Sequence, residues 1–180
     1  MTAMTLQSTY LTVPAIGYVG MLEGYGHDIA TMLNADSVSI PFGAAVALKP
    51  SPTTDKDAYL PATSSDNVFG IVAHSHAYGR TWTDADSTVH GELDGTGLVV
   101  GDMMNIVRRG KILVTPMQTV AVGDRLYVSY AVGTPFTAKG QLGNASVGST
   151  TIDCTTRGEW LTAATGTTGL AWLDCTFVSK

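Results

Sequence analysis

Short runs of alternating apolar and polar residues make up most of this chain, and turn residues separate the runs. The clearest run is 170–177, where every second residue is apolar. Side chains alternate between the two faces of an extended strand, so these apolar residues would share one face. They are Ala171, Leu173, Cys175 and Phe177. The pattern therefore predicts a strand near the C-terminus with one face in the core.

Two Gly-Asp pairs, Gly101-Asp102 and Gly123-Asp124, each lead into another alternating run. Glycine can adopt the positive φ that tight turns require, and an aspartate side chain can accept hydrogen bonds from nearby backbone amides. Both pairs therefore predict a turn that sets the entry into a strand.

Further short strands are expected along the rest of the chain. The runs 37–48 and 67–82 each predict one, with Pro41 marking an edge or a bulge and Gly70 an interruption. The stretch 98–116 predicts three more. With about eight short strands and little helix, the chain is predicted to be all-β, a small β-barrel or β-sandwich of β-tulip type.

The segment 27–35 is open to two interpretations. Asp28 could cap a short helix in which Ile29, Met32 and Leu33 recur at helical spacing. The same segment could equally be extended.

The N-terminal residues differ in pattern from the rest of the chain. We predict that residues 1–26 form an extended arm and that residues 27–180 form a single β-rich domain. Pro14 and four glycines keep any regular element short, yet apolar residues are frequent. Because a disordered tail would be polar, such an arm needs a surface to lie on, either its own domain or a neighbour. The apolar residues of this arm are Leu11, Val13, Ile16, Tyr18, Val19, Met21, Leu22 and Tyr25.

Composition narrows the possible partners. Charged residues make up 14% of the chain, against about 25% in ordinary domains, which suggests a surface partly covered by other subunits. The net charge is −5 and the densest basic stretch is only Arg108, Arg109 and Lys111, so we expect no nucleic-acid partner. Residues 1–13 lack the positive and apolar regions of a signal peptide, and no run of about 20 apolar residues occurs, so we expect neither a signal peptide nor a membrane partner.

The two cysteines, Cys154 and Cys175, lie among strand-like residues. Synthesis in a cytoplasm would leave both as reduced, buried hydrophobic residues. A disulfide between them is the alternative if their strands pair.

Candidate chemistry is sparse. His74 and His76 would share one strand face and could hold a metal ion, with His90, Asp84 or Asp86 as the third ligand. Two histidines without a third local partner are more often ordinary surface residues. No nucleophile with its base and no phosphate-binding loop is present, so we expect neither catalysis nor a cofactor.

Two other features have ordinary structural interpretations. Arg157-Gly158-Glu159 is expected to be a turn that carries two exposed charges. The alternative function is a receptor- or glycan-binding β-module on a virion surface, which would expose Trp82, Tyr59 or Tyr78 in a cluster of loops, and loops 49–66 and 83–97 are where its ligand would be sought.

Motifs in a common order along the chain resemble the structural cement proteins of tailed bacteriophages. The first match, residues 16–48, contains Gly20, His27-Asp28-Ile29 and Ile40-Pro41-Phe42-Gly43. The later matches are FGIVAHSH (69–76), GDMMNIVRRGKILV (101–114), VAVGDRLYV (120–128) and GEWLTAATGTTGLAWLDC (158–175). Each motif alone is only turns and alternation, but their shared order extends from residue 16 to the C-terminal part of the chain.

The resemblance implies a capsid decoration protein on the outer surface of the virion, made in the bacterial host cytoplasm. Such proteins bind the expanded head, usually as homotrimers, and hold neighbouring capsomers together against the pressure of packaged DNA. The expected partners are the major capsid protein and further copies of the chain. The expected contact residues are Leu11, Val13, Pro14, Ile16, Tyr18, Met21, Leu22, Tyr25, Ile40, Pro41 and Phe42.

Overall fold

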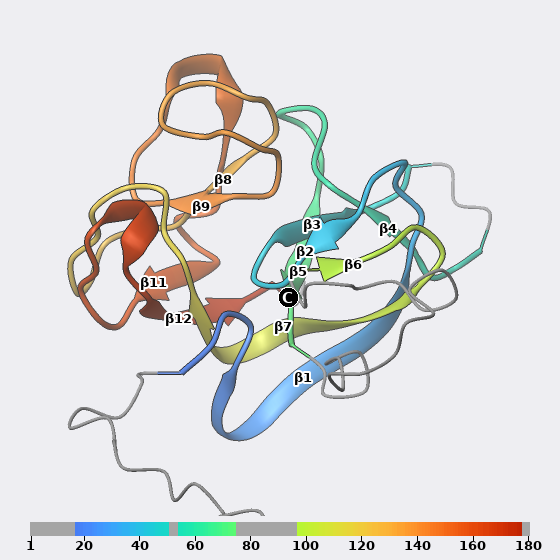
Figure 1. Cartoon of the computed structure of the whole chain (residues 1–180), viewed down its shortest axis with the longest axis horizontal. Coiled ribbons are helices and arrows are strands. Elements are labelled where there is room, and N and C mark those ends of the chain that lie inside the picture. The colour runs from blue at the N-terminus through green and yellow to red at the C-terminus, as the bar shows by residue number, and fades with distance from the viewer. Residues whose placement is uncertain (1–16, 51–53, 75–96, 178–180) are drawn as a thin grey trace, which may run out of the picture.

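A computed structural model describes residues 17–50, 54–74 and 97–177 (Figure 1). Its described part is built from two long strands, Leu22–Asn34 and Met103–Val114, ten short strands and two single-turn 3-10 helices, at Gly148–Thr150 and Gly166–Thr168. The strands are β1 (Leu22–Asn34), β2 (Ile40–Pro41), β3 (Ala45–Leu48), β4 (Asp57–Tyr59), β5 (Val68–Val72), β6 (Gly97–Leu98), β7 (Met103–Val114), β8 (Tyr127–Ser129), β9 (Leu142–Gly143), β10 (Thr151–Asp153), β11 (Gly158–Trp160) and β12 (Ala171–Thr176). The all-β prediction is confirmed.

Five of the strands close into a barrel in the order β1-β4-β3-β5-β7. The barrel closes because β1 pairs with β4 at Leu33 and Asn34 and also runs antiparallel to β7. The short β2–β6 ribbon supplies Ile40 and Leu98 to the same interior. We call this interior the barrel core. It contains Met32, Ile40, Phe42, Ala44, Val46, Ala58, Leu60, Val72, Leu98, Met104 and Ile106.

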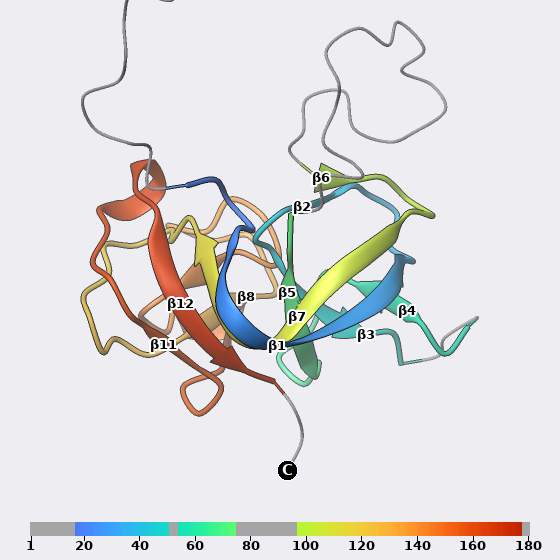
Figure 2. The same cartoon turned by 90° about the horizontal axis from the view of Figure 1, so that it is seen from below.

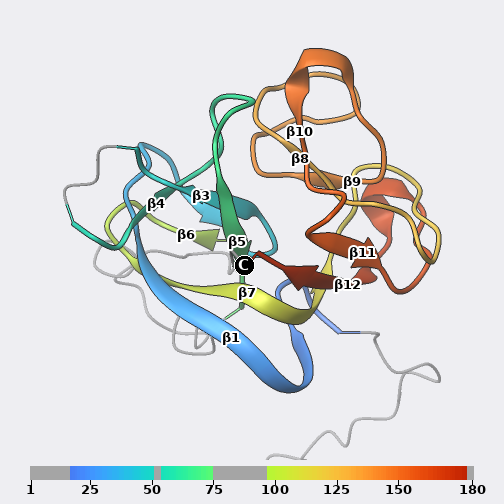
Figure 3. The ribbon, with the colours of Figure 1, turned by 180° about the vertical axis from the view of Figure 1, so that it is seen from behind.

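A second core lies outside the barrel wall. Beyond β7 the sheet continues into β12 and β11, and a separate three-stranded sheet runs in the order β10-β8-β9. Figure 3 shows these strands grouped on one side of the molecule, away from β3, β4 and β6. Their apolar side chains pack against the outer sides of β5 and β7, whose Ile71 and Val107 belong to this second core. The predicted C-terminal core face is confirmed, because Ala171, Leu173, Cys175 and Phe177 are all buried there.

The sequence predicts three short strands over residues 98–116. Most of this stretch instead forms β7, one continuous strand of 12 residues, so the predicted division is wrong. The chain passes through Gly110 with φ of 134° without breaking the pairing to β12. A Cβ at Gly110 would lie 2.3 Å from Cδ2 of His27, so glycine is needed there for room as well as for conformation.

The segment 27–35 is extended, which settles the choice that its pattern left open. Residues 29–33 of β1 pair in one register with β7, from Ile29 opposite Val107 to Leu33 opposite Met103, and the register shifts between Ile29 and Asp28, which lies opposite Arg109. Inter-strand hydrogen bonds therefore replace the helical ones, and Asp28 does not cap a helix. The prediction of an interruption at Gly70 is wrong, since β5 runs through it.

Both Gly-Asp turns form, with φ of 89° at Gly101 and 86° at Gly123. The Asp124 carboxylate accepts a hydrogen bond from the Ala121 N–H at 2.8 Å, three residues before it. This bond, followed by one from Asn144, lowers the pKa of Asp124. The backbone of Asp102 connects the first turn to β1, because the Asp102 carbonyl accepts a hydrogen bond from the Asn34 N–H at 2.8 Å.

The two cysteines are free and buried, so the expectation of reduced thiols is confirmed. Burial raises the pKa of both Cys154 and Cys175 to about 12. We expect both thiols in the native protein to react at pH 8 with a disulfide reagent on the order of a hundred-fold more slowly than in urea, because the thiolate is the reactive form. Stopped-flow absorbance of the released thiol would measure both rates. Fast labelling of the native protein would contradict the burial of these groups.

Candidate functional site

One exposed face of the sheet carries a row of charged side chains across four strands. Figure 2 looks toward β1, β7 and β12, which with β11 form this part of the sheet. Glu23 lies opposite Lys111, Lys111 opposite Asp174, and Asp174 opposite Glu159. Arg125 extends the row through an isolated bridge to Glu159. All five residues are exposed, and we call them the charged row.

The neighbouring residues on these strands point the other way, into the second core. These neighbouring residues also lie opposite one another across the four strands. They are Leu22, Ile112, Leu173 and Trp160. The last three are fully buried, and Leu22 packs against them. An antiparallel sheet with one buried and one solvated face produces this alternation, so the charged row is the outer face of a strongly anchored sheet.

An apolar row lies beside the charged row on the same outer face. Leu113 is opposite Trp172 in the β7–β12 pairing. Met21 and Leu161 continue the row, because the Leu113 N–H donates to the Met21 carbonyl at 2.8 Å and the Leu161 N–H donates to the Trp172 carbonyl at 2.7 Å. Trp172, Met21 and Leu161 are half-buried.

The first described residues of the chain lie on this apolar row. A Cβ at Gly17 would lie 2.7 Å from Cδ2 of Leu113 and 2.9 Å from the Met21 sulfur. Tyr18, which follows, is 42% exposed. Residues 1–16 lie outside the described part, and the chain enters that part at the edge of this outer face.

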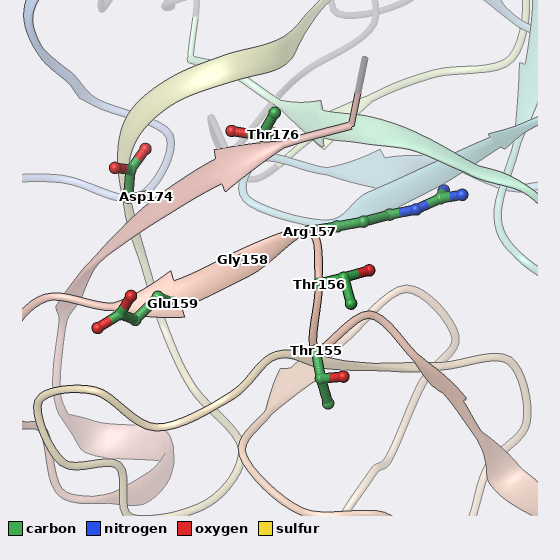
Figure 4. Close-up of a pocket in the computed structure, with 7 residues that line it drawn as sticks. All are labelled: Thr155, Thr156, Arg157, Gly158, Glu159, Asp174 and Thr176. Atoms are coloured by element: carbon green, nitrogen blue, oxygen red, sulfur yellow. The ribbon is translucent and has the colours of Figure 1, made fainter. Parts of the chain in front are cut away.

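Three shallow polar depressions follow the charged row. One of about 440 Å³ is lined by Glu23, His27, Lys111 and Asp174, among others. The next, of about 200 Å³, includes Asp174 and Glu159 (Figure 4). A third, of about 350 Å³, includes Glu159 and Arg125. Because neighbouring depressions share residues, they form one open track and not a closed catalytic cleft.

The lining of the track contains charged, threonine and glycine residues without a nucleophile that is paired with a base. Figure 4 shows the Arg157 side chain leading away from Glu159. Its Nη1 donates to the Asn67 Oδ1 at 2.8 Å and to the Val68 carbonyl at 3.0 Å. The expectation of a turn with two exposed charges at residues 157–159 is confirmed only in part: Arg157 lies in a turn and Glu159 is exposed, but Gly158 and Glu159 belong to β11, and Arg157 is half-buried and joins it to β5.

The candidate metal ligands are not brought together in the described part of the chain. His74 packs between two aromatic rings, with its centroid 4.6 Å from those of both Tyr18 and Phe42. His76, His90, Asp84 and Asp86 lie outside the described residues. Within residues 17–50, 54–74 and 97–177, three or more metal-ligating side chains do not gather at any point.

The candidate glycan-binding aromatics are divided in the same way. Burial, and next a hydrogen bond to Asp66, raise the pKa of Tyr59 to about 12. Tyr59 is half-buried, whereas Trp82 and Tyr78 lie outside the described residues. The described part also has no helix long and apolar enough to cross a membrane.

The expected contact residues fall in several places. Tyr18 and Pro41 are exposed, and Met21 lies on the apolar row. Ile40 and Phe42 fill the barrel core, where their side chains are covered. Leu22 faces the second core. The side chain of Tyr25, together with Leu11, Val13, Pro14 and Ile16, lies outside what the structure describes.

The charged row itself was not anticipated from the sequence. Lys111, Asp174 and Glu159 each lie next to an apolar residue of the predicted strands, Ile112, Leu173 and Trp160 in turn, which is the available signal. Their alignment depends on the register between strands far apart in the chain, and no local pattern contains that register.

Comparison with known proteins gives a family and a structural neighbour. A family model described as structural cement protein (E217 gp24/Pam3 gp6) matches residues 6–176. Among solved structures, a chain from "The capsid of Myoviridae Phage XM1" matches with a TM-score of 0.64 and 12% sequence identity, covering 97% of this chain and 100% of that chain. That likeness concerns the fold. No curated protein matches.

Proposed function

Because this chain belongs to the phage structural cement protein family, we propose that it binds the outer surface of the expanded head and bridges neighbouring capsomers. A structural role in the virion follows from the family. The finer parts of the proposal are attachment to the major capsid protein, resistance to the pressure of packaged DNA, and assembly as a homotrimer after synthesis in the bacterial host cytoplasm. The role needs no catalysis, cofactor, membrane or nucleic acid.

The observation that carries the proposal is the outer sheet face. Its apolar row leaves Trp172 and Met21 half-buried, so part of each side chain is open to a partner. Protein interfaces have an apolar centre of this kind. The chain also enters its described part on this face, at Gly17 over Leu113.

The apolar segment 1–16 would extend the contact beyond the domain. Extended segments can add a strand to the sheet edge of another protein, where backbone hydrogen bonds supply affinity. We place the main contacts at Leu11, Val13, Pro14 and Ile16 of this segment and at Tyr18, Met21 and Pro41 of the domain. Several weak contacts in one oligomer would add up through effective concentration.

Deleting residues 1–16 is expected to abolish co-sedimentation with undecorated, expanded heads at micromolar protein. The deletion ends before Gly17, because Leu22 to Gly26 belong to β1 and removing them would damage the barrel. The full chain should bind saturably and raise the temperature at which the heads open. The matched control is Lys139→Ala, an exposed change on the loop after β8.

Circular dichroism of the truncated protein would verify that the domain is folded. Truncated protein that is folded and binds as tightly as the full chain would overturn the role given to this segment. Full-length protein that does not bind heads would overturn the proposed function as a whole.

A further inference from the structure

We propose that the charged row is a self-complementary contact that joins this protein to a second copy across a two-fold axis. This contact belongs to the free protein and goes beyond attachment to a capsid. Its occupant is another outer sheet face of the same chain, turned through 180°.

The order of signs along the row leads to this inference. From β1 to the far edge the residues are Glu23, Lys111, Asp174, Glu159 and Arg125, and their charges are negative, positive, negative, negative and positive. Adjacent strands are about 4.8 Å apart, so the charges are evenly spaced. A two-fold axis that runs perpendicular to the row, in the plane of the contact, places the row against its own reverse, because the same patch is used on both subunits.

With the axis at Asp174, the reversed row is nearly its own complement. Glu23 meets the second copy's Arg125, and Lys111 meets the second copy's Glu159. Each of these contacts occurs twice, once in each direction. The central contact alone joins like charges, since Asp174 faces its own symmetry mate.

Moving the axis removes this match. An axis midway between Lys111 and Asp174 still pairs those two residues, but it places Glu23 against Glu159 and leaves Arg125 without a counterpart. An axis midway between Asp174 and Glu159 pairs carboxylates with carboxylates and Lys111 with Arg125. Asp174 is therefore the position of the axis that the row selects.

The five charges are available to a second copy. All five side chains are exposed. Among the described residues, the structure gives an ion pair within 4.0 Å between Arg108 and Asp28, and neither residue belongs to the charged row. The depressions on both sides of Asp174 leave room for long side chains from the opposite face.

Such a contact has a place on a capsid. Closed oligomers at the three-fold positions of an icosahedral shell face their neighbours across two-fold axes. A self-complementary face would join neighbouring oligomers there without any change in the capsid protein. The order of charges is nearly complementary to the same order reversed, and this property favours a second copy of the chain over a different protein as the partner.

Two charge reversals test the pairing. Both changes act on the two contacts between Lys111 of one copy and Glu159 of the other. Lys111→Glu alone places two carboxylates at each of these contacts, and Glu159→Lys alone places two ammonium groups at each of them. Each variant alone should self-associate on the order of ten-fold more weakly than the natural protein, because like charges across an interface repel. An equimolar mixture of the two variants restores opposite charges at both contacts and should associate as the natural protein does.

A third variant tests the axis. Asp174→Asn removes the one like-charge contact, so it should strengthen self-association and lower the protein concentration at which the larger species forms. Sedimentation velocity over a concentration series would measure each association. Restored association in the mixture also shows that both single variants are folded.

Three outcomes would overturn the proposal: a mixture no tighter than the separate variants, single variants that associate like the natural protein, or no association of either the natural protein or Asp174→Asn. Head binding is measured separately with the truncated and full chains. A chain that fails to bind heads but shows the restored association would refute the capsid role and leave this contact standing.

Discussion

Replacing Trp160 with alanine is expected to lower the free energy of unfolding by about 3–5 kcal/mol. Trp160 has no exposed surface and is among the largest fully buried side chains in the described part of the chain. It lies opposite Leu173 on β12, in the second core. Removing the indole would leave a cavity between two sheets that cannot both move inward, so the contacts of its neighbours would be lost.

The Trp160 backbone also connects this strand to the second Gly-Asp turn. Its N–H donates to the Asp124 carbonyl at 3.1 Å, and its carbonyl accepts from the Gly123 N–H at 2.8 Å. These bonds do not depend on the side chain, so the alanine variant should keep the β11 pairing. The expected loss is therefore mainly a packing loss.

Two other tryptophan changes serve as controls in urea unfolding measured by circular dichroism. Trp172→Ala removes a half-buried side chain on the outer face and should cost clearly less than Trp160→Ala. Trp160→Phe should cost about half as much as alanine, because Nε1 of Trp160 makes no hydrogen bond in the structure and most of the apolar volume is kept. Equal losses for Trp160→Ala and Trp172→Ala would contradict the assignment of Trp160 to the core.

Replacing Gly70 with alanine is expected to destabilise the protein by about 3 kcal/mol, the upper part of the range for overpacked cores. The added Cβ would lie 2.4 Å from the Val107 carbonyl oxygen and 2.6 Å from Cγ2 of Ile106. One of these atoms belongs to the backbone of β7, which also pairs with β1 and β12. The barrel wall must therefore shift to admit a single methyl group.

The matched control is Gly24→Ala on the exposed part of β1. A Cβ there would meet no atom within 4 Å, but φ is 83°, so the change should cost about 1 kcal/mol from backbone strain alone. Gly70 has no positive φ, so its effect is purely steric. Thermal unfolding of both variants would compare the two causes, and a Gly70→Ala loss no larger than that of Gly24→Ala would refute the close approach of β5 to β7.

The sequence was a good guide wherever local chemistry decides the structure. Period-two alternation identified Ala171, Leu173, Cys175 and Phe177 as a buried face, because strand geometry sends alternate side chains to opposite sides. Gly101 and Gly123 were identified as turn residues because few other residues adopt a positive φ. The order of these turn motifs was also sufficient for the resemblance to the cement proteins, which the family match confirms.

The remaining features depend on which distant strands pair. Residues 27–35 have no local preference strong enough to choose between helix and strand, and pairing with β7 decides it. Ile40 and Phe42 are as apolar as a contact surface would require, yet closure of the barrel buries both. The sequence predicts an interruption at Gly70, which instead lies within β5, where a Cβ would be only 2.4 Å from the Val107 carbonyl oxygen of β7.

The charged row illustrates the same division. The alternation alone places Lys111, Asp174 and Glu159 on the side opposite their apolar neighbours Ile112, Leu173 and Trp160, since that property belongs to each strand separately. Their alignment into one row with Glu23 and Arg125 belongs to the register, which is set by the packing of Leu22, Ile112, Leu173 and Trp160 on the buried side. A shift of one residue would turn every one of these side chains to the opposite face, so the second core determines the outer surface.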